Sequence, residues 1–238
     1  MAPEPVTGTA PRAVRPVLLR QEWRDVAFLH WDIDPAVAAP LLPAGTRPDL
    51  LDGRTFVGLI ALRMQVRAPL GGLPLPWLGS FGQVNVRLYS VDEDGRRGVA
   101  FRSLDAGRLL PAAVGRAGGL PYAWAGVHIS RDGDRCSYRV HRRAGGASAS
   151  IELHLGPRLA PGPLERFVTD RWGLHHRVLG RTVFTAVAHP PWQLHTASAD
   201  EIHPGLLGAA GLPGDLGPPV SVLWSPRVDD VRIGPRAP

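Results

Sequence analysis

The 238-residue chain contains no lysine, because all 27 of its basic residues are arginine. A guanidinium group keeps its proton at any working pH, so arginine can bind an anion but cannot act as an amine nucleophile. Chemistry in which a lysine forms an imine with a carbonyl substrate is therefore excluded. The formal net charge of +6 raises the question of nucleic-acid binding. The arginines are scattered from Arg12 to Arg236 without an aromatic-interleaved basic motif, and this argues against such a partner.

Cysteine and long apolar runs are also scarce. Cys136 is the single cysteine, which rules out an intrachain disulfide and is typical of proteins in a reducing compartment. The longest apolar run, residues 56–62, is too short to span a bilayer, and residues 1–20 lack the apolar region of a signal peptide. We therefore expect a cytoplasmic protein without membrane contact.

The motifs of several enzyme classes are missing. The sequence has no Gly-x-Ser-x-Gly elbow, no phosphate-binding glycine-rich loop and no dinucleotide fingerprint. Its nine histidines form no His-x-x-x-His or Cys/His ligand pattern, so the sequence predicts neither a metal site nor a cofactor. Cys136 has no activating motif beside it and is interpreted as a packed thiol.

Turn residues and short alternating segments dominate what is present. The chain has 28 glycines and 25 prolines, which is typical of many short strands joined by turns. Alternation with period two predicts strands at 26–32, 54–66, 81–91, 97–105, 122–130, 135–143, 148–155, 181–189 and 220–232. Short helices are expected at 35–42, with Asp34 as N-cap, at 108–117 and at 163–172. This pattern predicts a mainly β (β-rich α+β) fold, a curved or closed sheet with two or three short helices.

No linker, repeat or charge block divides the middle of the chain. We expect residues 21–232 to form a single domain, since barrels and sandwiches commonly reach this length. Residues 1–20 are predicted to be a flexible N-terminal arm, and residues 233–238 a loose C-terminal tail.

The strand predicted at 81–91 carries polar and apolar side chains at alternate positions. Its polar row consists of Gln83, Asn85, Arg87 and Tyr89, and its apolar row of Val84, Val86 and Leu88. In one interpretation the polar row faces solvent. In the other it lines the lumen of a barrel, where Arg87 would bind a carboxylate through two hydrogen bonds.

Six further residues are candidates for the same lumen. His30 and Asp32 share one face of the first strand, where Asp32 would orient the imidazole for proton transfer; the alternative is a structural histidine. Ser103 and Asp105 continue the face of Phe101, although Asp105 also suits the N-cap of the helix that follows. Arg171 and His189 are secondary candidates, with a buried ion pair and a rigid turn as their structural alternatives.

Several short segments, in the same order along the chain, resemble the YqjF-like family of unknown function, whose fold is similar to that of acetoacetate decarboxylase. They are Phe28-Leu29-His30-Trp31; Leu42-Pro43 with Pro48-Asp49 and Asp52-Gly53; Asn85-Val86-Arg87 with Tyr89; Ser103-Leu104-Asp105-Ala106; Leu120-Pro121-Tyr122; Leu164-Glu165 with Arg171; and His189 with Pro191-Trp192. The resemblance implies a cone-like, double-layered β-barrel with an internal cavity that Asn85 and Arg87 face. The family often has a glutamate at the position of Gln83, and the decarboxylase mechanism needs a lysine that this chain lacks.

Two functional hypotheses follow. The first is a barrel that binds a small polar or anionic organic ligand through Gln83, Asn85, Arg87, Tyr89 and Ser103. The second is an imine-independent lyase, hydratase or isomerase acting on a small oxo or hydroxy acid, with Arg87 as anchor and His30 moving a proton. Either function is compatible with a homo-oligomer.

Overall fold

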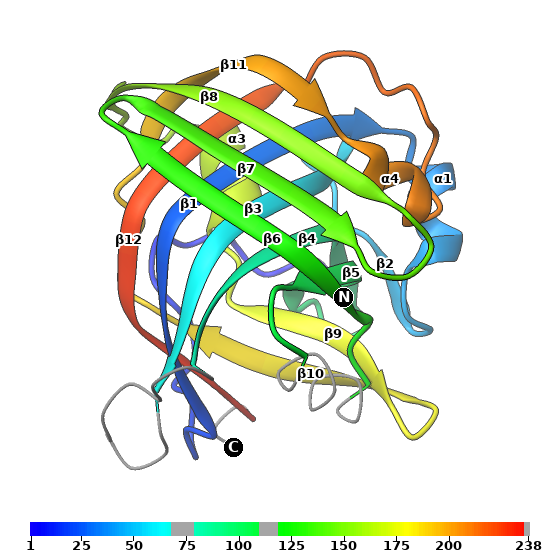
Figure 1. Ribbon diagram of the computed structural model, residues 1–238. Coiled ribbons are helices and arrows are strands. Elements are labelled where there is room, and N and C mark those ends of the chain that lie inside the picture. Colours follow the sequence, from blue (N-terminus) through cyan, green and yellow to red (C-terminus); the bar gives the residue numbers. More distant parts are fainter. Residues whose placement is uncertain (68–78, 110–118, 236–238) are drawn as a thin grey trace.

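The structure, a computed structural model, describes residues 1–67, 79–109 and 119–235. Within these residues the chain forms one twelve-stranded sheet that curves back on itself (Figure 1). Its strands are β1 (Leu19–Ile33), β2 (Thr46–Pro48), β3 (Thr55–Arg67), β4 (Ser80–Asp92), β5 (Arg97–Ala106), β6 (Tyr122–Asp132), β7 (Arg135–Arg142), β8 (Ser148–Arg158), β9 (Gly173–Val178), β10 (Arg181–Ala188), β11 (His195–His203) and β12 (Ser221–Gly234). The predicted mainly β fold is confirmed.

The helices are short and lie outside the sheet. They are α1 (Pro35–Ala38), the 3-10 turn η1 (Ala39–Leu41), α3 (Pro163–Thr169) and α4 (Gly205–Ala209). The carboxylate of Asp34 accepts a hydrogen bond of 2.7 Å from the amide of Ala36, so the predicted N-cap is confirmed. The helix expected at 108–117 falls mostly on residues outside the described ranges. None of the helices in the described part of the chain has the length and apolar content needed to cross a membrane.

Five strands belong to two closed rings at once. With β9 and β10, the strands β12, β1, β3, β4 and β5 form a seven-stranded ring, because β9 pairs with β5 and β10 pairs with β12. With β6, β7, β8 and β11 instead, the same five strands form a nine-stranded ring. In Figure 1 the strands β6 to β8 and β11 arch above the shared strands, and β9 and β10 run below them. The shared strands are therefore enclosed on both faces.

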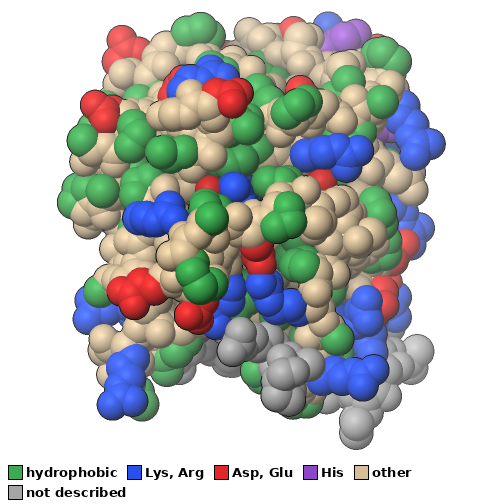
Figure 2. All heavy atoms as spheres, turned by 180° about the vertical axis from the view of Figure 1, so that it is seen from behind, with side chains coloured by type: hydrophobic (Ala, Val, Ile, Leu, Met, Phe, Trp, Pro, Cys, Tyr) green, Lys and Arg blue, Asp and Glu red, His purple; other side chains and the backbone are tan. Residues whose placement is uncertain are grey.

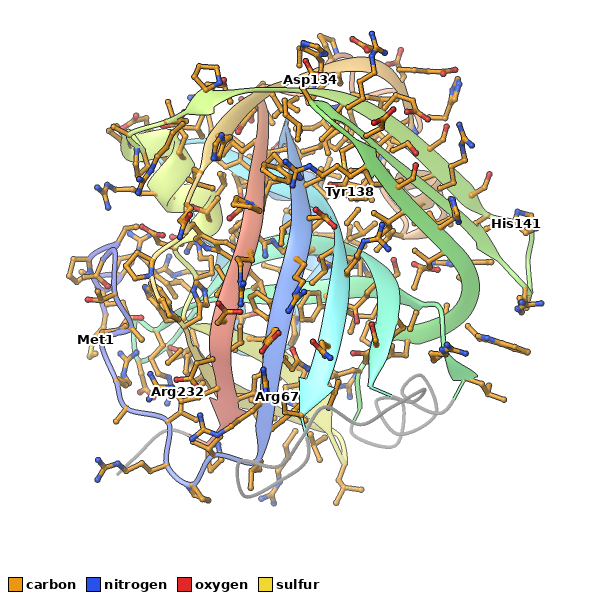
Figure 3. All side chains as sticks on the ribbon, turned by 60° about the vertical axis from the view of Figure 1, so that its left-hand side comes forward. Met1, Arg67, Asp134, Tyr138, His141 and Arg232 are labelled. Atoms are coloured by element: carbon orange, nitrogen blue, oxygen red, sulfur yellow. The ribbon has the colours of Figure 1, made fainter. Side chains whose placement is uncertain are left out.

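The nine-stranded ring encloses the main apolar core. Leu29 of β1, Leu59 of β3 and Val86 of β4 face Tyr138 of β7 and Ile151 of β8, and all five are fully buried. Figure 3 shows Tyr138 pointing into this interior. Alternate positions of β4 thus supply the core, as the sequence predicts for its apolar row.

The N-terminal segment lies against the barrel wall, where Figure 3 labels Met1. The amide of Glu4 donates to the carbonyl of Gly95 at 2.9 Å, and the indole of Trp172 donates to the carbonyl of Thr7 at 2.8 Å. Val14 is buried beside Ala186. The predicted arm is therefore held by specific contacts rather than extending freely. At the other end, β12 runs to Gly234 and takes in two residues of the predicted tail, because its last residues pair with β1 and β10.

Arginine side chains are spread over the outer surface. On the face in Figure 2, they lie among acidic and apolar side chains, and the described residues of that face form no continuous basic stripe. Many of the arginines contact a carboxylate, as Arg139 does with Glu152 at 2.9 Å. Such exposed pairs contribute little to stability, since water and salt screen them.

Candidate functional site

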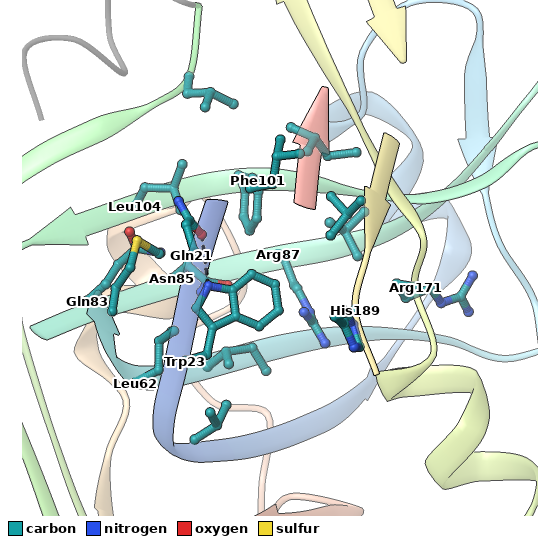
Figure 4. A pocket seen from close by; sticks show the side chains of 18 of the residues that line it. Gln21, Trp23, Leu62, Gln83, Asn85, Arg87, Phe101, Leu104, Arg171 and His189 are labelled. Carbon is teal, nitrogen blue, oxygen red and sulfur yellow. Dashed lines mark hydrogen bonds between the residues drawn. The ribbon is translucent and has the colours of Figure 1, made fainter. Parts of the chain in front are cut away.

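The seven-stranded ring encloses a cavity of about 240 Å³. Side chains from all seven of its strands line the cavity, together with residues of the segments that follow α3 and β10. Most of the lining is apolar. The lining includes two arginines, Arg87 and Arg171, and two histidines, His176 and His189. Figure 4 shows Arg87, Arg171 and His189 together on one side.

Three members of the predicted polar row line this cavity: Gln83, Asn85 and Arg87. They face inward because β4 is shared by both rings, so its polar row meets the cavity while its apolar row fills the core. The fourth member, Tyr89, is fully buried behind Arg87. Its hydroxyl donates to the carbonyl of Val168 at 2.8 Å and accepts from Nε of Arg87 at 3.2 Å. The solvent-facing interpretation of the row does not match this arrangement.

The guanidinium of Arg87 is held by neutral groups. Besides Tyr89, it binds the carbonyl of Val168 through Nη2 at 2.8 Å. It also lies over the rings of Tyr89, 5.4 Å from the centroid, and Phe28, 6.0 Å from the centroid. No ion pair among the described residues includes Arg87. Its positive charge is thus positioned by hydrogen bonds and aromatic faces but is not neutralised by a carboxylate.

Arg171 shares one carboxylate with a second arginine. Nη1 of Arg171 lies 2.5 Å from Oδ2 of Asp49, and Nη1 of Arg97 lies 2.6 Å from Oδ1 of the same group. Nε of Arg171 donates to the carbonyl of Phe167 at 2.6 Å, whereas its Nη2 is buried without a partner in the described part of the chain. Both sequence interpretations of Arg171 therefore hold in part, since it forms a buried ion pair and also lines the cavity.

His189 contributes a neutral imidazole to the cavity wall. Nδ1 lies 2.7 Å from the carbonyl oxygen of Pro190, and because a carbonyl can only accept, Nδ1 carries the proton. Burial lowers the pKa of His189 to about 4, and the nearby charge of Arg87 acts in the same direction. At neutral pH the ring is therefore uncharged, with the lone pair on Nε2. The ring is wedged against Trp172, at 4.6 Å between centroids, and Trp192, at 4.8 Å.

The predicted His30–Asp32 pair is corrected by the structure. Asp32 lies near the exposed end of β1, where its carboxylate contacts Nη1 of Arg54 at 3.4 Å. His30 is fully enclosed between the rings of Phe28 and Tyr89, and neither of its ring nitrogens has a partner among the described residues. Burial holds the pKa of His30 well below its usual range. His30 therefore lies behind the cavity wall, without the carboxylate that was expected to orient it.

The predicted position of Ser103 in the lumen is also wrong, because simple alternation does not hold along β5. Val86 pairs with Ser103 but Arg87 pairs with Phe101, so Arg102 is an extra residue in β5 and the strand bulges there. Phe101 and Leu104 consequently line the cavity, and Ser103 is buried on the opposite face with an unpartnered hydroxyl. Asp105 follows Ser103 on that face. It is not an N-cap but binds Nε of Arg142 at 2.5 Å.

A second bulge explains why the sequence did not predict that Gln21 and Trp23 line the cavity. The sequence interpretation began the first strand at 26, whereas β1 begins at Leu19. Its pairing with β3 shifts between Arg24 and Ala27, around Asp25, whose φ is +48°. The bulge reverses the alternation, so Gln21 and Trp23 before it face the same cavity as Phe28 after it. A tryptophan in the otherwise polar run 21–25 is the signal that would have suggested an inward position.

Comparisons with known proteins agree with this architecture. The family model DUF2071, described as an uncharacterized conserved protein, matches residues 20–229. The uncharacterized protein YqjF of Bacillus subtilis (strain 168) is 29% identical over 191 residues, which cover 77% of each chain.

Solved structures with the same fold are more distant in sequence. The acetoacetate decarboxylase of Legionella pneumophila superposes with a TM-score of 0.59 and 16% identity, covering 95% of this chain and 90% of the other. The enduracididine biosynthesis enzyme MppR complexed with pyruvate gives 0.58 and 15%, covering 92% and 90%. The resemblance noted in the sequence is confirmed: the chain belongs to the DUF2071 family of YqjF-like proteins and has an acetoacetate decarboxylase-like fold.

Proposed function

We propose that the protein binds a small organic carboxylate in the cavity of the seven-stranded ring, with Arg87 as the anchor. The observation that carries this proposal is the unbalanced charge of Arg87 in a mostly apolar enclosure. Arg87 is partly buried, and a cation that loses part of its hydration is costly unless an anion or several hydrogen bonds compensate it. A carboxylate suits the planar guanidinium, which can donate two parallel hydrogen bonds to it.

The surroundings of Arg87 strengthen its attraction for an anion. Asp49 already serves both Arg97 and Arg171, so this group of three guanidiniums has one carboxylate. Nη2 of Arg171 is buried and has no partner in the described residues. His30 and His189 add no negative charge. Among the described residues, the guanidiniums of Arg87, Arg97 and Arg171 thus have a single ion-paired carboxylate between them, which favours an anionic ligand over a neutral one.

A structural neighbour is consistent with this class of ligand. MppR, which shares the fold, was solved with pyruvate bound, and pyruvate is a small carboxylate. The chemistry need not be shared, since one fold supports many functions. The lysine-free sequence in any case excludes an imine between a lysine side chain and a carbonyl compound.

Thermal unfolding tests the proposal. We expect small oxo and hydroxy acids at about 100 times their Kd to stabilise the protein by about 2.7 kcal/mol. For a domain of this size, that stabilisation corresponds to a rise in Tm of about 5–10 °C. Arg87→Gln should abolish the rise in Tm. Arg54→Gln is the control: it removes an exposed arginine immediately before β3, outside the cavity lining, and should retain the rise. An equal response from the Arg87 variant would refute the anchor.

A second candidate function, an imine-independent lyase, hydratase or isomerase, is favoured by His189 rather than by His30. The neutral His189 ring lines the cavity, so Nε2 can accept a proton from a ligand held by Arg87. Incubation with hydroxy acids in D2O, followed by NMR, separates the two functions. Exchange of the α-proton that is lost in His189→Gln supports catalysis, whereas a bound ligand that keeps its α-proton supports binding alone.

A further inference from the structure

The cavity has a cationic side and an uncharged side (Figure 4). Arg87, Arg171 and His189 lie together, and Leu62 and Leu104 lie at the opposite end. The described residues bring no charged side chain to that opposite end of the lining. A ligand held by its carboxylate at Arg87 therefore extends toward uncharged, mostly apolar side chains.

Of the three amide side chains in the lining, those of Gln21 and Gln83 have protein partners, whereas Oδ1 of Asn85 has none among the described residues. Oε1 of Gln83 accepts from the hydroxyl of Tyr122 at 3.3 Å. Oε1 of Gln21 accepts from the indole of Trp23 at 2.8 Å. These contacts tie two of the amide oxygens to the wall. Most of the other side chains at this end are apolar, namely Phe28, Ile60, Leu62, Met64, Phe101 and Leu104. An apolar ligand group placed there would gain free energy by leaving water.

His189 adds a requirement for a hydrogen-bond donor. Its Nδ1–H is committed to the carbonyl of Pro190, and three tryptophans hold the ring, so Nε2 can only accept. Figure 4 shows the guanidinium of Arg87 beside this ring. A donor on the carbon next to a bound carboxylate would therefore come close to Nε2.

On the basis of the carboxylate site proposed above, we infer that the preferred ligands are 2-hydroxy acids with an apolar side chain larger than methyl. The carboxylate binds Arg87, the hydroxyl donates to Nε2 of His189, and the side chain packs against Phe101 and Leu104. A 2-oxo acid offers only acceptors, so its keto oxygen opposes the lone pair of Nε2. A 2-amino acid has donors, but its positive charge would lie beside Arg87 and Arg171 in a site with low dielectric.

Isothermal titration calorimetry on the full chain tests this inference with lactate, 2-hydroxybutyrate and 2-hydroxyvalerate. Affinity should rise about fourfold for each added methylene, the gain expected when a methylene is fully buried. 2-Hydroxyvalerate should bind about tenfold or more tightly than 2-oxovalerate, because the oxo acid leaves a buried acceptor without a donor. Norvaline, the matching amino acid, should bind more weakly than 2-hydroxyvalerate.

Two variants of His189 separate its role from general damage to the fold. His189→Phe should remove the preference for hydroxy over oxo acids while the dependence on chain length remains. His189→Gln, which supplies an acceptor oxygen, should restore part of that preference. Equal binding of lactate and 2-hydroxyvalerate by the wild type would overturn the apolar subsite, and equal binding of the hydroxy and oxo acids would overturn the role of His189. If no acid binds the wild type, the Arg87 site itself fails, which is a distinct result.

Discussion

Asp49→Ala is expected to lower the free energy of unfolding by about 3–5 kcal/mol, the usual loss when one partner of a buried ion pair is removed. Asp49 is fully buried and binds Arg97 and Arg171 together. Its removal leaves two guanidiniums with fewer partners in a region that excludes water, and Arg171 is itself buried. Equilibrium unfolding in urea, followed by tryptophan fluorescence, measures the change.

Asp32→Ala is the matched control for this prediction. It also removes an aspartate from an arginine, but the Asp32–Arg54 pair is half exposed and 3.4 Å long. Such pairs contribute about 0.2–1 kcal/mol. Similar losses for the two variants would mean that Arg97 and Arg171 find compensation elsewhere, and that Asp49 does not hold the positive group together.

The second large effect is a loss of stability in acid caused by His189. The pKa of its ring is about 4 in the folded protein, against an ordinary value of 6.5, because burial disfavours the charged form. Between these values the unfolded chain binds more protons than the folded one. The contribution of His189 is therefore complete above pH 6.5 and is lost as the pH falls toward 4, by about 3 kcal/mol in total. His30, whose pKa is also lowered by burial, acts in the same direction.

The measurement is a comparison of unfolding curves for the wild type and His189→Gln at several pH values. Asp170 must be considered, because burial raises the pKa of its carboxyl to about 6 and its protonation stabilises the fold as the pH falls. This opposing contribution is present in both proteins and cancels in their difference. We expect the wild type to lose stability more steeply between pH 6.5 and 4. Parallel curves would show that the His189 ring is protonated as easily in the folded protein as in the unfolded chain.

The sequence predicts the inward polar row because alternation within a single regular strand is a local property. β4 is unbroken from Gln83 to Tyr89, so positions that share a face in the sequence share it in the structure. Where a strand bulges, alternation fails, and this explains both the wrong position of Ser103 and the omission of Trp23. A bulge depends on the pairing of two strands and has no period of its own.

Ion-pair partners that are far apart in the chain also could not be predicted from the sequence. Asp49 lies in the loop after β2, and Arg171 lies in the segment after α3. The two residues come together only when these segments meet in the folded protein. His30 and Asp32 are close in sequence, but one is enclosed and the other lies at a rim, which residue spacing does not reveal. The strands β9 and β11 were missed because β9 has six residues and β11 lacks regular apolar alternation.

Sharing strands between two rings has a consequence for how this protein can be altered. In β4 the odd positions from 83 to 87 face the cavity, and the even positions from 84 to 88 face the main apolar core. In β3 the assignment is reversed, with 60, 62 and 64 toward the cavity and 57, 59 and 61 toward that core. One thin wall thus separates two sets of residues that can be varied independently. A mutagenesis library restricted to the cavity set would change the shape and polarity of the cavity while leaving the residues of the main apolar core unchanged.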